Sequence, residues 1–310
     1  MESESKRISV TELIYGSRTP RKDILAPFLT SHSLTFVYAP AGVGKTYLSL
    51  KLSHSVASLT PFLKWMGQEA FTTIYFDGEM GRESLANRIE AIDLGSGDSV
   101  SPERFSFVIG EDFPEGMPNL ADPNEQHYYD REIIESNADV IVIDNLQSCA
   151  APSDKYMGEI EMWKEIRKWA YRYKNKGKAV MLVDHPNAQG QLYGSTQKKN
   201  AADTVIRLSP PAVNLTGLET WDNAFELHFE KGRHMTRHEQ QPLWVEVYSN
   251  EEEGMRFKCS SLFDYHVSLM SHFKKAKIAD IAGALGVSYQ HAAYLRSQYE
   301  SFRGDGEDEG

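Results

Sequence analysis

The 310-residue chain is poor in cysteine and has no long apolar run. Only Cys149 and Cys259 occur, which excludes a disulfide framework or a cysteine-based metal site and favours a reducing, cytoplasmic location. No stretch is long and apolar enough to span a bilayer. Residues 1–5 are polar and lack the apolar core of a signal peptide. We therefore expect no contact with a membrane.

Positive charge is also scarce. The chain has 33 Lys and Arg against 44 Asp and Glu, a formal net charge of −11. This argues against a protein that is coated in nucleic acid over its whole surface, but it leaves room for a narrow basic channel or a small basic domain. The length fits one large α/β domain with something small attached.

What the sequence does contain is a glycine-rich turn between a strand-like and a helix-like stretch. Residues 34–38 form a short apolar run typical of a buried strand, and residues 47–57 carry apolar positions at helical spacing. Strand, glycine-rich turn, Gly-Lys-Thr and helix make up a phosphate-binding loop, although Ala39 stands where the strict pattern has Gly. Lys45 would reach the β- and γ-phosphates, and the Thr46 hydroxyl would bind Mg²⁺. The expected ATP-binding residues are Ala39, Pro40, Ala41, Gly42, Val43, Gly44, Lys45, Thr46 and Tyr47.

Strands and helices alternate after this loop. Further apolar strands are expected at 72–76, 105–109, 139–144 and 179–184, with helical stretches after 77–80 to about 92, at 129–136 and at 158–174. Such alternation predicts a parallel sheet that is buried on both faces. The segments 205–208, 225–229 and 243–247 come without long helices between them and are expected to complete one edge of the sheet.

Two carboxylates are expected beside the phosphate loop. Asp144 ends a run of β-branched residues, which is the Walker B arrangement that presents a carboxylate to Mg²⁺ or to its bound water. Glu79 follows the strand 72–76, where strand ends form the active-site edge, and it could orient or deprotonate the water that attacks the γ-phosphate. The alternative is that Asp77 and Glu79 only cap the following helix.

Two further motifs leave alternatives open. His185 follows the strand 179–184 in the same row, where it is either a contact of the γ-phosphate or a structural histidine. Lys231 and Arg233 flank a glycine at a strand end. They fit a solvated turn, or fingers that are inserted into a neighbour's nucleotide site.

Together, the phosphate loop, 76–80, 141–146, 185–195 and 231–234 resemble the RecA-like hexameric ATPases, in particular the RepA-type plasmid and phage replicative helicase group. The likeness covers roughly residues 30–250. It implies that Glu79 is the catalytic base and His185 a γ-phosphate sensor, and that Lys231 and Arg233 act on the ATP of the adjacent subunit. The catalytic set is then Lys45, Glu79, Asp144, His185, Lys231 and Arg233, with Thr46 and Asp144 holding Mg²⁺.

The same resemblance implies that loops after the fourth and fifth strands, at about 148–157 and 186–200, line a central channel for single-stranded DNA. Their expected contacts are Lys155, Lys198 and Lys199. Residues 263–302 resemble a helix-turn-helix, with Gly286 in the turn and Ser288 capping the second helix. The expected DNA contacts there are Lys274, Lys275, Lys277, Tyr289, Gln290, His291 and Arg296. The alternative for this region is a small helical bundle that makes subunit or protein contacts.

The sequence therefore predicts an α/β, RecA-like fold with a mostly parallel sheet flanked by helices, plus a small C-terminal helix-turn-helix domain. The expected units are an arm over 1–30, the ATPase domain over 31–262, the helix-turn-helix over 263–302 and an acidic disordered tail over 303–310. We expect a ring-forming, Mg²⁺-dependent ATPase, a homo-oligomer and most simply a hexamer, that acts on DNA as a mobile-element replicative helicase. The alternatives are a RecA-like regulatory or recombination ATPase that binds DNA or a partner protein without unwinding, and a DNA-binding regulator with a degenerate ATP site. The intact Lys45, Thr46, Glu79 and Asp144 weigh against the last of these.

Overall fold

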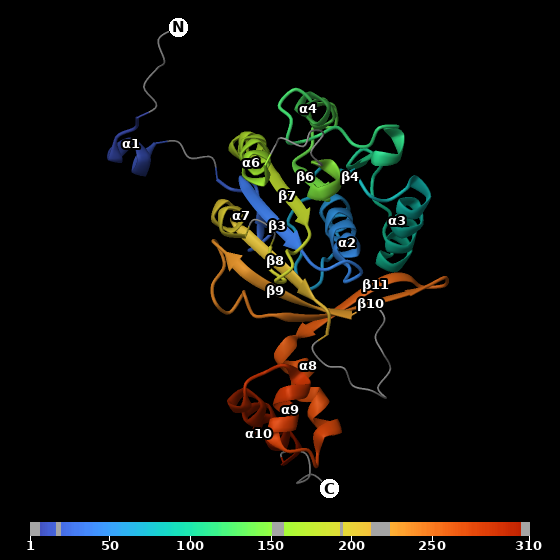
Figure 1. Ribbon diagram of the computed structural model, residues 1–310, viewed down its shortest axis with the longest axis vertical. Coiled ribbons are helices and arrows are strands. Elements are labelled where there is room, and N and C mark those ends of the chain that lie inside the picture. Colours follow the sequence, from blue (N-terminus) through green and yellow to red (C-terminus); the bar gives the residue numbers. More distant parts are fainter. Residues whose placement is uncertain (1–6, 17–19, 151–157, 193–194, 212–223, 305–310) are drawn as a thin grey trace.

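A nine-stranded sheet lies at the centre of the computed structural model, which describes residues 7–16, 20–150, 158–192, 195–211 and 224–304 (Figure 1). The strand order is β11-β10-β9-β8-β3-β7-β6-β4-β5. The run from β8 to β5 is parallel, and β9, β10 and β11 join it by antiparallel pairing. The bounds are β3 (Ser33–Tyr38), β4 (Thr73–Asp77), β5 (Phe105–Ile109), β6 (Val140–Asp144), β7 (Ala179–Asp184), β8 (Thr204–Ser209), β9 (Ala224–Gly232), β10 (Leu243–Asn250) and β11 (Gly254–Ser261).

Helices cover both faces of the parallel part, as the apolar strands require. Successive residues of β6 point to opposite sides: Val140 and Val142 belong to the core under α2 (Lys45–Ser58) and α3 (Arg82–Ser96). Ile141 and Ile143 belong to the core under α4 (Gln126–Glu135) and α6 (Glu159–Asn175). Each face thus has a separate apolar core, and the expected α/β fold is confirmed.

The hairpin of β10 and β11 extends the sheet beside α3, and the sequence did not predict β11. Its burial falls off along the strand, so the apolar alternation that marks a strand is weak. β11 packs very closely on α3, since a Cβ on Gly95 of α3 would lie 2.1 Å from the carbonyl oxygen of Met255 on β11. Only glycine at position 95 permits this packing.

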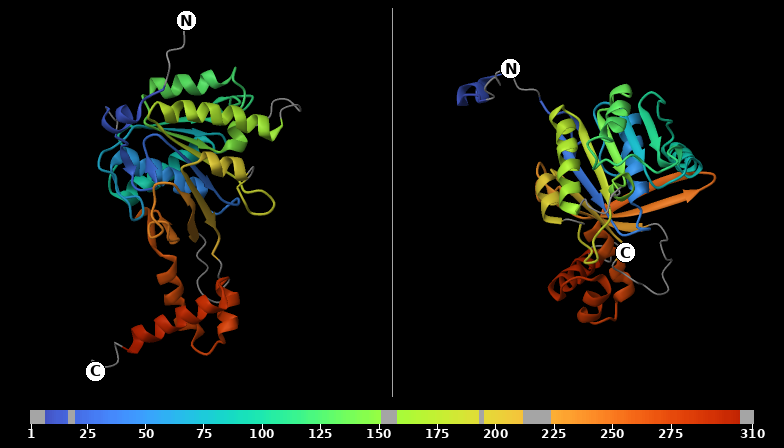
Figure 2. Two further views of the ribbon diagram at one scale, coloured as in Figure 1. Left: turned by 90° about the vertical axis from the view of Figure 1, so that its left-hand side faces the viewer. Right: turned by 45° about the horizontal axis from the view of Figure 1, so that its top comes forward.

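The C-terminal helices α8 (Leu262–Leu269), α9 (Ile278–Leu285) and α10 (Tyr289–Gly304) lie beyond the antiparallel edge of the sheet (Figure 2). Ile281, Leu285, Ala292 and Leu295 form part of a core that belongs to this region alone. The chain turns between α9 and α10 at Gly286, whose φ of +61° favours glycine. The ring of Tyr265 stacks on Trp244 of β10 at 3.7 Å and joins the helices to the sheet.

Small elements complete the described chain. They are α1 (Val10–Tyr15), which buries none of its residues, β1 (Asp23–Leu25), β2 (Leu29–Thr30), η1 (Gly110–Asp112), α5 (Leu146–Cys149), α7 (Ser195–Ala201) and η2 (Met270–Phe273). Within the described ranges, no helix is both long and apolar enough to cross a membrane.

Candidate active site

The phosphate loop joins β3 to α2 and is shaped by two glycines with positive φ. Gly42 has φ +79° and Gly44, which precedes the helix, has φ +109°. A Cβ on Gly44 would also lie 3.2 Å from the ring of Phe225. Left-handed backbone and lack of space both favour glycine here, and they leave the N–H groups at the start of α2 available for an anion.

Lys45 opens α2 and lies folded back on its own loop. Its ammonium donates to the carbonyl oxygens of Ala39 at 2.7 Å and Pro40 at 3.2 Å. Burial lowers the pKa of Lys45, while the charges of Asp144, Glu79 and Asp184 act in the opposite direction. A buried lysine among carboxylates, beside free helix N–H groups, fits a site for phosphate oxygens.

Asp144 ends β6 in register with Asp77, which ends β4. Asp144 is buried and accepts a hydrogen bond of 2.5 Å from the Tyr75 hydroxyl and another from Thr46. Burial raises the pKa of Asp144, and these two hydrogen bonds and Lys45 partly offset that rise. The Thr46 hydroxyl and Asp144 carboxylate are adjacent oxygen donors, which is the donor set that Mg²⁺ prefers. The two predicted Mg²⁺ ligands therefore fit the ion.

Glu79 and His185 are linked through Asn145. The Asn145 amide donates to Glu79 Oε2 at 2.6 Å, and its nitrogen lies 3.3 Å from His185 Nε2. His185 Nδ1 in turn lies 3.4 Å from the ammonium of Lys45. Asn145 also accepts from Ser148 N–H and so caps α5. The structure thus brings Lys45, His185 and Glu79 into one continuous set of polar contacts.

Asn145 is a residue whose role the sequence reasoning missed. The signal was its position directly after Asp144, at a strand end beside the loop. Tyr75 was missed for a different reason, because it belongs to an apolar strand and shows its polar function only through its contact with Asp144.

The alternative in which Asp77 and Glu79 serve only as caps of α3 is wrong, because neither carboxylate binds an N–H group of that helix, and Asp77 holds the turn before it. Asp77 Oδ1 accepts from the N–H groups of Glu79 at 3.1 Å and Met80 at 2.6 Å. Burial raises the pKa of Asp77 to about 6. The first-turn N–H of α3, that of Arg82, is bound instead by Glu111. Glu79 is exposed, and its carboxylate is directed to Asn145.

The expected DNA contacts on α7 differ in their surroundings. Lys198 is buried and forms an ion pair of 2.7 Å with Asp184, whose other oxygen accepts from His185 N–H. This corrects the expectation of an open DNA contact, because a buried ammonium that already neutralises Asp184 is not presented at a surface. Lys199 is partly exposed and pairs with Glu230 at 2.6 Å. Lys155 lies outside the described residues.

Lys231 and Arg233 lie at the amino ends of the parallel strands, whereas the phosphate loop lies at their carboxyl ends. Lys231 is paired with Val205 near the start of β8, whereas Tyr38, which directly precedes the loop, is paired with Arg207. The Lys231 ammonium donates to the carbonyl oxygens of Lys199 and Asn200 at the end of α7. The structure therefore does not bring this pair to the phosphate loop of its own chain.

The C-terminal residues that were expected to contact DNA differ in how exposed they are. Lys274, Lys275, Lys277, Tyr289 and Gln290 are exposed, and His291 is half-buried. Arg296 requires a correction. Its guanidinium donates to the carbonyl oxygens of Phe273 at 2.7 Å and Ala276 at 2.8 Å, so it holds the segment before α9 instead of facing a ligand.

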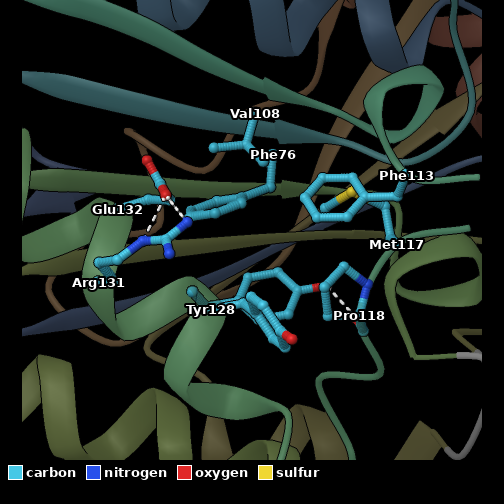
Figure 3. Close-up of a pocket in the computed structure, with 9 residues that line it drawn as sticks. Phe76, Val108, Phe113, Met117, Pro118, Tyr128, Arg131 and Glu132 are labelled. Carbon is cyan, nitrogen blue, oxygen red and sulfur yellow. Dashed lines mark hydrogen bonds and ion pairs between the residues drawn. The ribbon is translucent and has the colours of Figure 1, made fainter.

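An apolar hollow lies on the α4 face of the sheet (Figure 3). Phe113, Met117 and Tyr128 line it, and the one cation at its rim, Arg131, is paired with Glu132 at 2.7 Å. This lining contains none of the phosphate-binding groups described above, so the hollow is separate from the active site.

Comparison with known proteins agrees with this geometry. A family model described as "AAA domain" matches residues 2–191, which is more than half of the chain. The chain belongs to the AAA domain family. Membership implies nucleotide binding, and this AAA domain protein carries the phosphate loop within the matched residues.

A solved structure of a KaiC-like protein from the hyperthermophilic archaeon Pyrococcus horikoshii resembles this AAA domain protein. The TM-score is 0.51 at 15% sequence identity, and the match covers 76% of this chain and 93% of that chain. At this identity the likeness shows the fold alone, which is RecA-like. Together with the family match, it supports a RecA-like P-loop ATPase. No curated protein sequence matches the chain. The RepA-type grouping stays a prediction.

Proposed function

We propose that this protein hydrolyses ATP with Mg²⁺, and that it does so as a ring of identical subunits acting on DNA. The observation that carries the proposal is the contact path Lys45–His185–Asn145–Glu79. It connects the cation that would bind the phosphates to the carboxylate that would act on water. A turn that bound nothing would have no use for such a path.

Each group has a distinct task in the proposed reaction. Lys45 leaves its contacts with Ala39 and Pro40 and binds the β- and γ-phosphate oxygens. Glu79 orients the attacking water and accepts its proton. Asn145 fixes the Glu79 carboxylate, and His185 is near enough to Lys45 to report whether the γ-phosphate is present. Thr46 and Asp144 would hold Mg²⁺, which when bound neutralises phosphate charge.

The proposed ring follows from the position of Lys231 and Arg233. They lie at the sheet edge away from their own phosphate loop, so phosphates that they contact would belong to a neighbouring subunit. Head-to-tail contacts of this kind close into rings when the rotation permits. An arginine supplied in this way stabilises the negative charge of phosphoryl transfer. A hexamer is the expected size.

The DNA function is proposed at two levels. Binding of single-stranded DNA in the ring would use Lys199, which must exchange its partner Glu230 for a DNA phosphate, together with Lys155. Duplex binding would use the exposed lysines before α9 and the start of α10. The narrower proposal is a replicative helicase of a mobile element.

ATP hydrolysis measured with and without single-stranded DNA tests this function. We expect Mg²⁺-dependent hydrolysis in the wild type, stimulation by single-stranded DNA, and opening of a forked duplex. Lys45→Ala is the control without nucleotide binding. Stimulation without opening of the fork would favour the regulatory or recombination ATPase. Absence of hydrolysis in every condition would contradict the proposed activity.

Salt dependence of DNA affinity tests the contact residues. Lys199→Ala should weaken single-stranded DNA binding and flatten its salt dependence, because fewer counterions are released. Lys168→Ala is the matched control, since Lys168 is an exposed lysine on α6 that pairs with Glu165. An unchanged salt slope in Lys199→Ala would move the DNA path away from α7. Lys274→Ala with Lys275→Ala examines duplex binding in the same way.

A further inference from the structure

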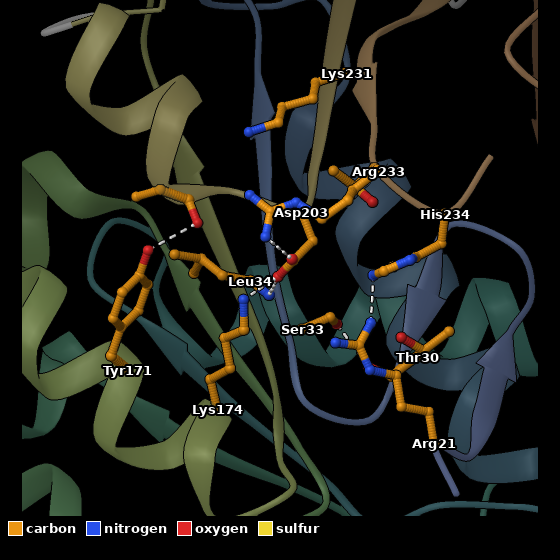
Figure 4. A network of polar contacts seen from close by, with 12 residues as sticks. Arg21, Thr30, Ser33, Leu34, Tyr171, Lys174, Asp203, Lys231, Arg233 and His234 are labelled. Atoms are coloured by element: carbon orange, nitrogen blue, oxygen red, sulfur yellow. Dashed lines mark hydrogen bonds and ion pairs between the residues drawn. The ribbon is translucent and has the colours of Figure 1, made fainter. Parts of the chain in front are cut away.

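Cations gather near a single carboxylate at the amino ends of the parallel strands (Figure 4). We call this end of the sheet the far edge, because the phosphate loop lies at the carboxyl ends, the loop edge. Asp203 precedes β8 and is only 1% exposed. Its Oδ2 accepts from the Leu34 N–H at 2.9 Å and pairs with Lys174 at 2.5 Å. Its Oδ1 lies 3.4 Å from the Arg233 guanidinium, beyond a well-formed hydrogen bond. Lys174 therefore takes most of the carboxylate's charge.

Arg233 is held loosely and remains accessible. Its side chain is 49% exposed, and its backbone N–H donates to the carbonyl oxygen of Asp203. The backbone is thus fixed at this point while about half of the side-chain surface of Arg233 is exposed. Lys231 lies two residues earlier and binds only carbonyl oxygens of α7 through its ammonium.

Arg21 reaches the same place from the arm before β1. Its guanidinium contacts Nε2 of His234, the residue next to Arg233 (Figure 4). Burial lowers the pKa of His234, and the charges of Arg21 and Arg233 lower it further, so the ring is neutral and accepts from Arg21. Among the described residues, Arg21 has no carboxylate partner. The next residue, Lys22, differs from Arg21 in this respect, because its ammonium pairs with Glu69.

These residues form a cation cluster, defined as Arg21, Lys174, Lys231 and Arg233. Lys174 and Arg233 face the carboxylate of Asp203 directly, the charge of Asp203 also acts on Lys231, and Arg21 joins them through His234. Mutual repulsion is visible in Lys231, whose pKa is lowered first by burial and then by Arg233. A chain with a net charge of −11 has few cations, so a surplus of three at one edge indicates an anionic ligand.

We propose that Arg21 joins Lys231 and Arg233 in binding phosphate oxygens, and that these oxygens belong to the ATP held by the phosphate loop of a neighbouring subunit. This inference rests on the proposed function. Guanidinium groups suit such a ligand because they present planar, paired N–H donors to phosphate. His234 holds Arg21 beside Arg233, so two arginines from separate parts of the chain meet the same ligand. Arg21 is then a catalytic residue contributed by the arm.

Mixing two defective proteins tests the proposal. Arg21→Ala should lower turnover roughly 10- to 100-fold, the effect of losing a charge-assisted contact to the transition state. ATP binding should change little. When Arg21→Ala is mixed with Lys45→Ala before nucleotide is added, some interfaces pair an intact loop with an intact cation cluster, and hydrolysis should recover above either protein alone. Arg21→Lys should retain part of the turnover. Lys22→Ala is the matched control and should behave as wild type.

Several outcomes would overturn the proposal. Near wild-type turnover in Arg21→Ala would exclude Arg21 from the reaction. Low turnover without recovery, with subunit exchange verified by fluorescence transfer, would mean that Arg21 acts within its own subunit. Weaker single-stranded DNA binding with a flatter salt slope, at unchanged DNA-free hydrolysis, would assign the phosphates to DNA instead. Retained hydrolysis in wild type and its loss in Glu79→Gln keep the proposed ATPase intact in each case, so the two failures are distinguishable.

Discussion

The two edges of the parallel sheet have opposite charge arrangements. At the loop edge, where the strands end, four carboxylates, those of Asp77, Glu79, Asp144 and Asp184, accompany two cations, Lys45 and Lys198. At the far edge, the four cations of the cation cluster are accompanied by one carboxylate, that of Asp203, which pairs with Lys174 and Arg233. Neither edge is balanced by itself. The carboxylates of the loop edge suit a bound metal cation, but its cations neutralise only part of the charge of a bound phosphate. The cation cluster of the far edge suits phosphate oxygens.

One subunit therefore carries the two complementary halves of a site at opposite ends of its parallel strands, where its own fold keeps them apart. A head-to-tail contact between copies would bring them together, and opposite potentials would favour that orientation over head-to-head contact.

Removal of Arg233 should have the largest effect. Arg233→Ala should lower turnover roughly 10³-fold or more, since an arginine that stabilises the transition state is worth that much elsewhere. Nucleotide binding to the subunit should be nearly unchanged. Mixing with Lys45→Ala should restore hydrolysis, as measured by phosphate release. No recovery at any ratio, with subunit exchange demonstrated, would show that the far edge does not act on a neighbour.

Glu79→Gln removes the negative charge of Glu79 at the loop edge but keeps the size and shape of the side chain. Turnover should fall roughly 10³-fold, the range for a general base, while ATP affinity stays near wild type because Asn145 and Lys45 are kept. Single-turnover hydrolysis and nucleotide titration separate the two effects. Glu83→Gln, an exposed residue in the first turn of α3, is the control. Normal turnover in Glu79→Gln would show that the base is another residue.

Asp203→Ala removes the carboxylate of the far edge and should lower the stability of the protein. Lys174 is only 15% exposed on its side chain and would lose its carboxylate. The free energy of unfolding should fall by about 3 kcal/mol, as when one partner of a buried pair is removed. Urea unfolding measures it. Glu69→Ala removes the exposed partner of Lys22 and should cost under about 0.5 kcal/mol. Equal losses in the two variants would mean that Asp203 is not the anchor of the far edge.

Asp77 gives the smallest expected effect, which depends on pH. Its folded pKa of about 6 lies above its ordinary 3.8, so the folded state keeps a proton that the unfolded chain releases in between. Stability therefore falls as pH rises through this window, by at most about 3 kcal/mol in total. Asp77→Asn keeps the acceptor for Met80 N–H and should remove that fall. Unfolding from pH 4 to 7 without nucleotide or Mg²⁺ checks this, and identical slopes in both proteins would contradict it.

Much of the parallel core could be predicted from local pattern. The runs ending at Tyr38, Asp144 and Asp184 are mostly apolar and are buried on every residue, because each strand is covered on both faces. β11 could not be predicted, since its outer residues are polar and its position depends on the close approach of Gly254 and Gly95 to one another's elements. The burial of Lys198 and the inward contacts of Arg296 were missed for a related reason. A lysine or arginine in sequence gives no indication of which carboxylate or carbonyl it will meet.

The sequence by itself determined the phosphate loop, the α/β alternation and the row of polar residues at the strand ends, because these depend on neighbours within a few positions. Tertiary structure decided which side chains touch. It joined Asn145 to Glu79 and His185, separated the turn-forming role of Asp77 from the directed carboxylate of Glu79, and brought Arg21 to His234 across 213 positions of chain. Such contacts depend on strand order and packing, and no local pattern specifies them.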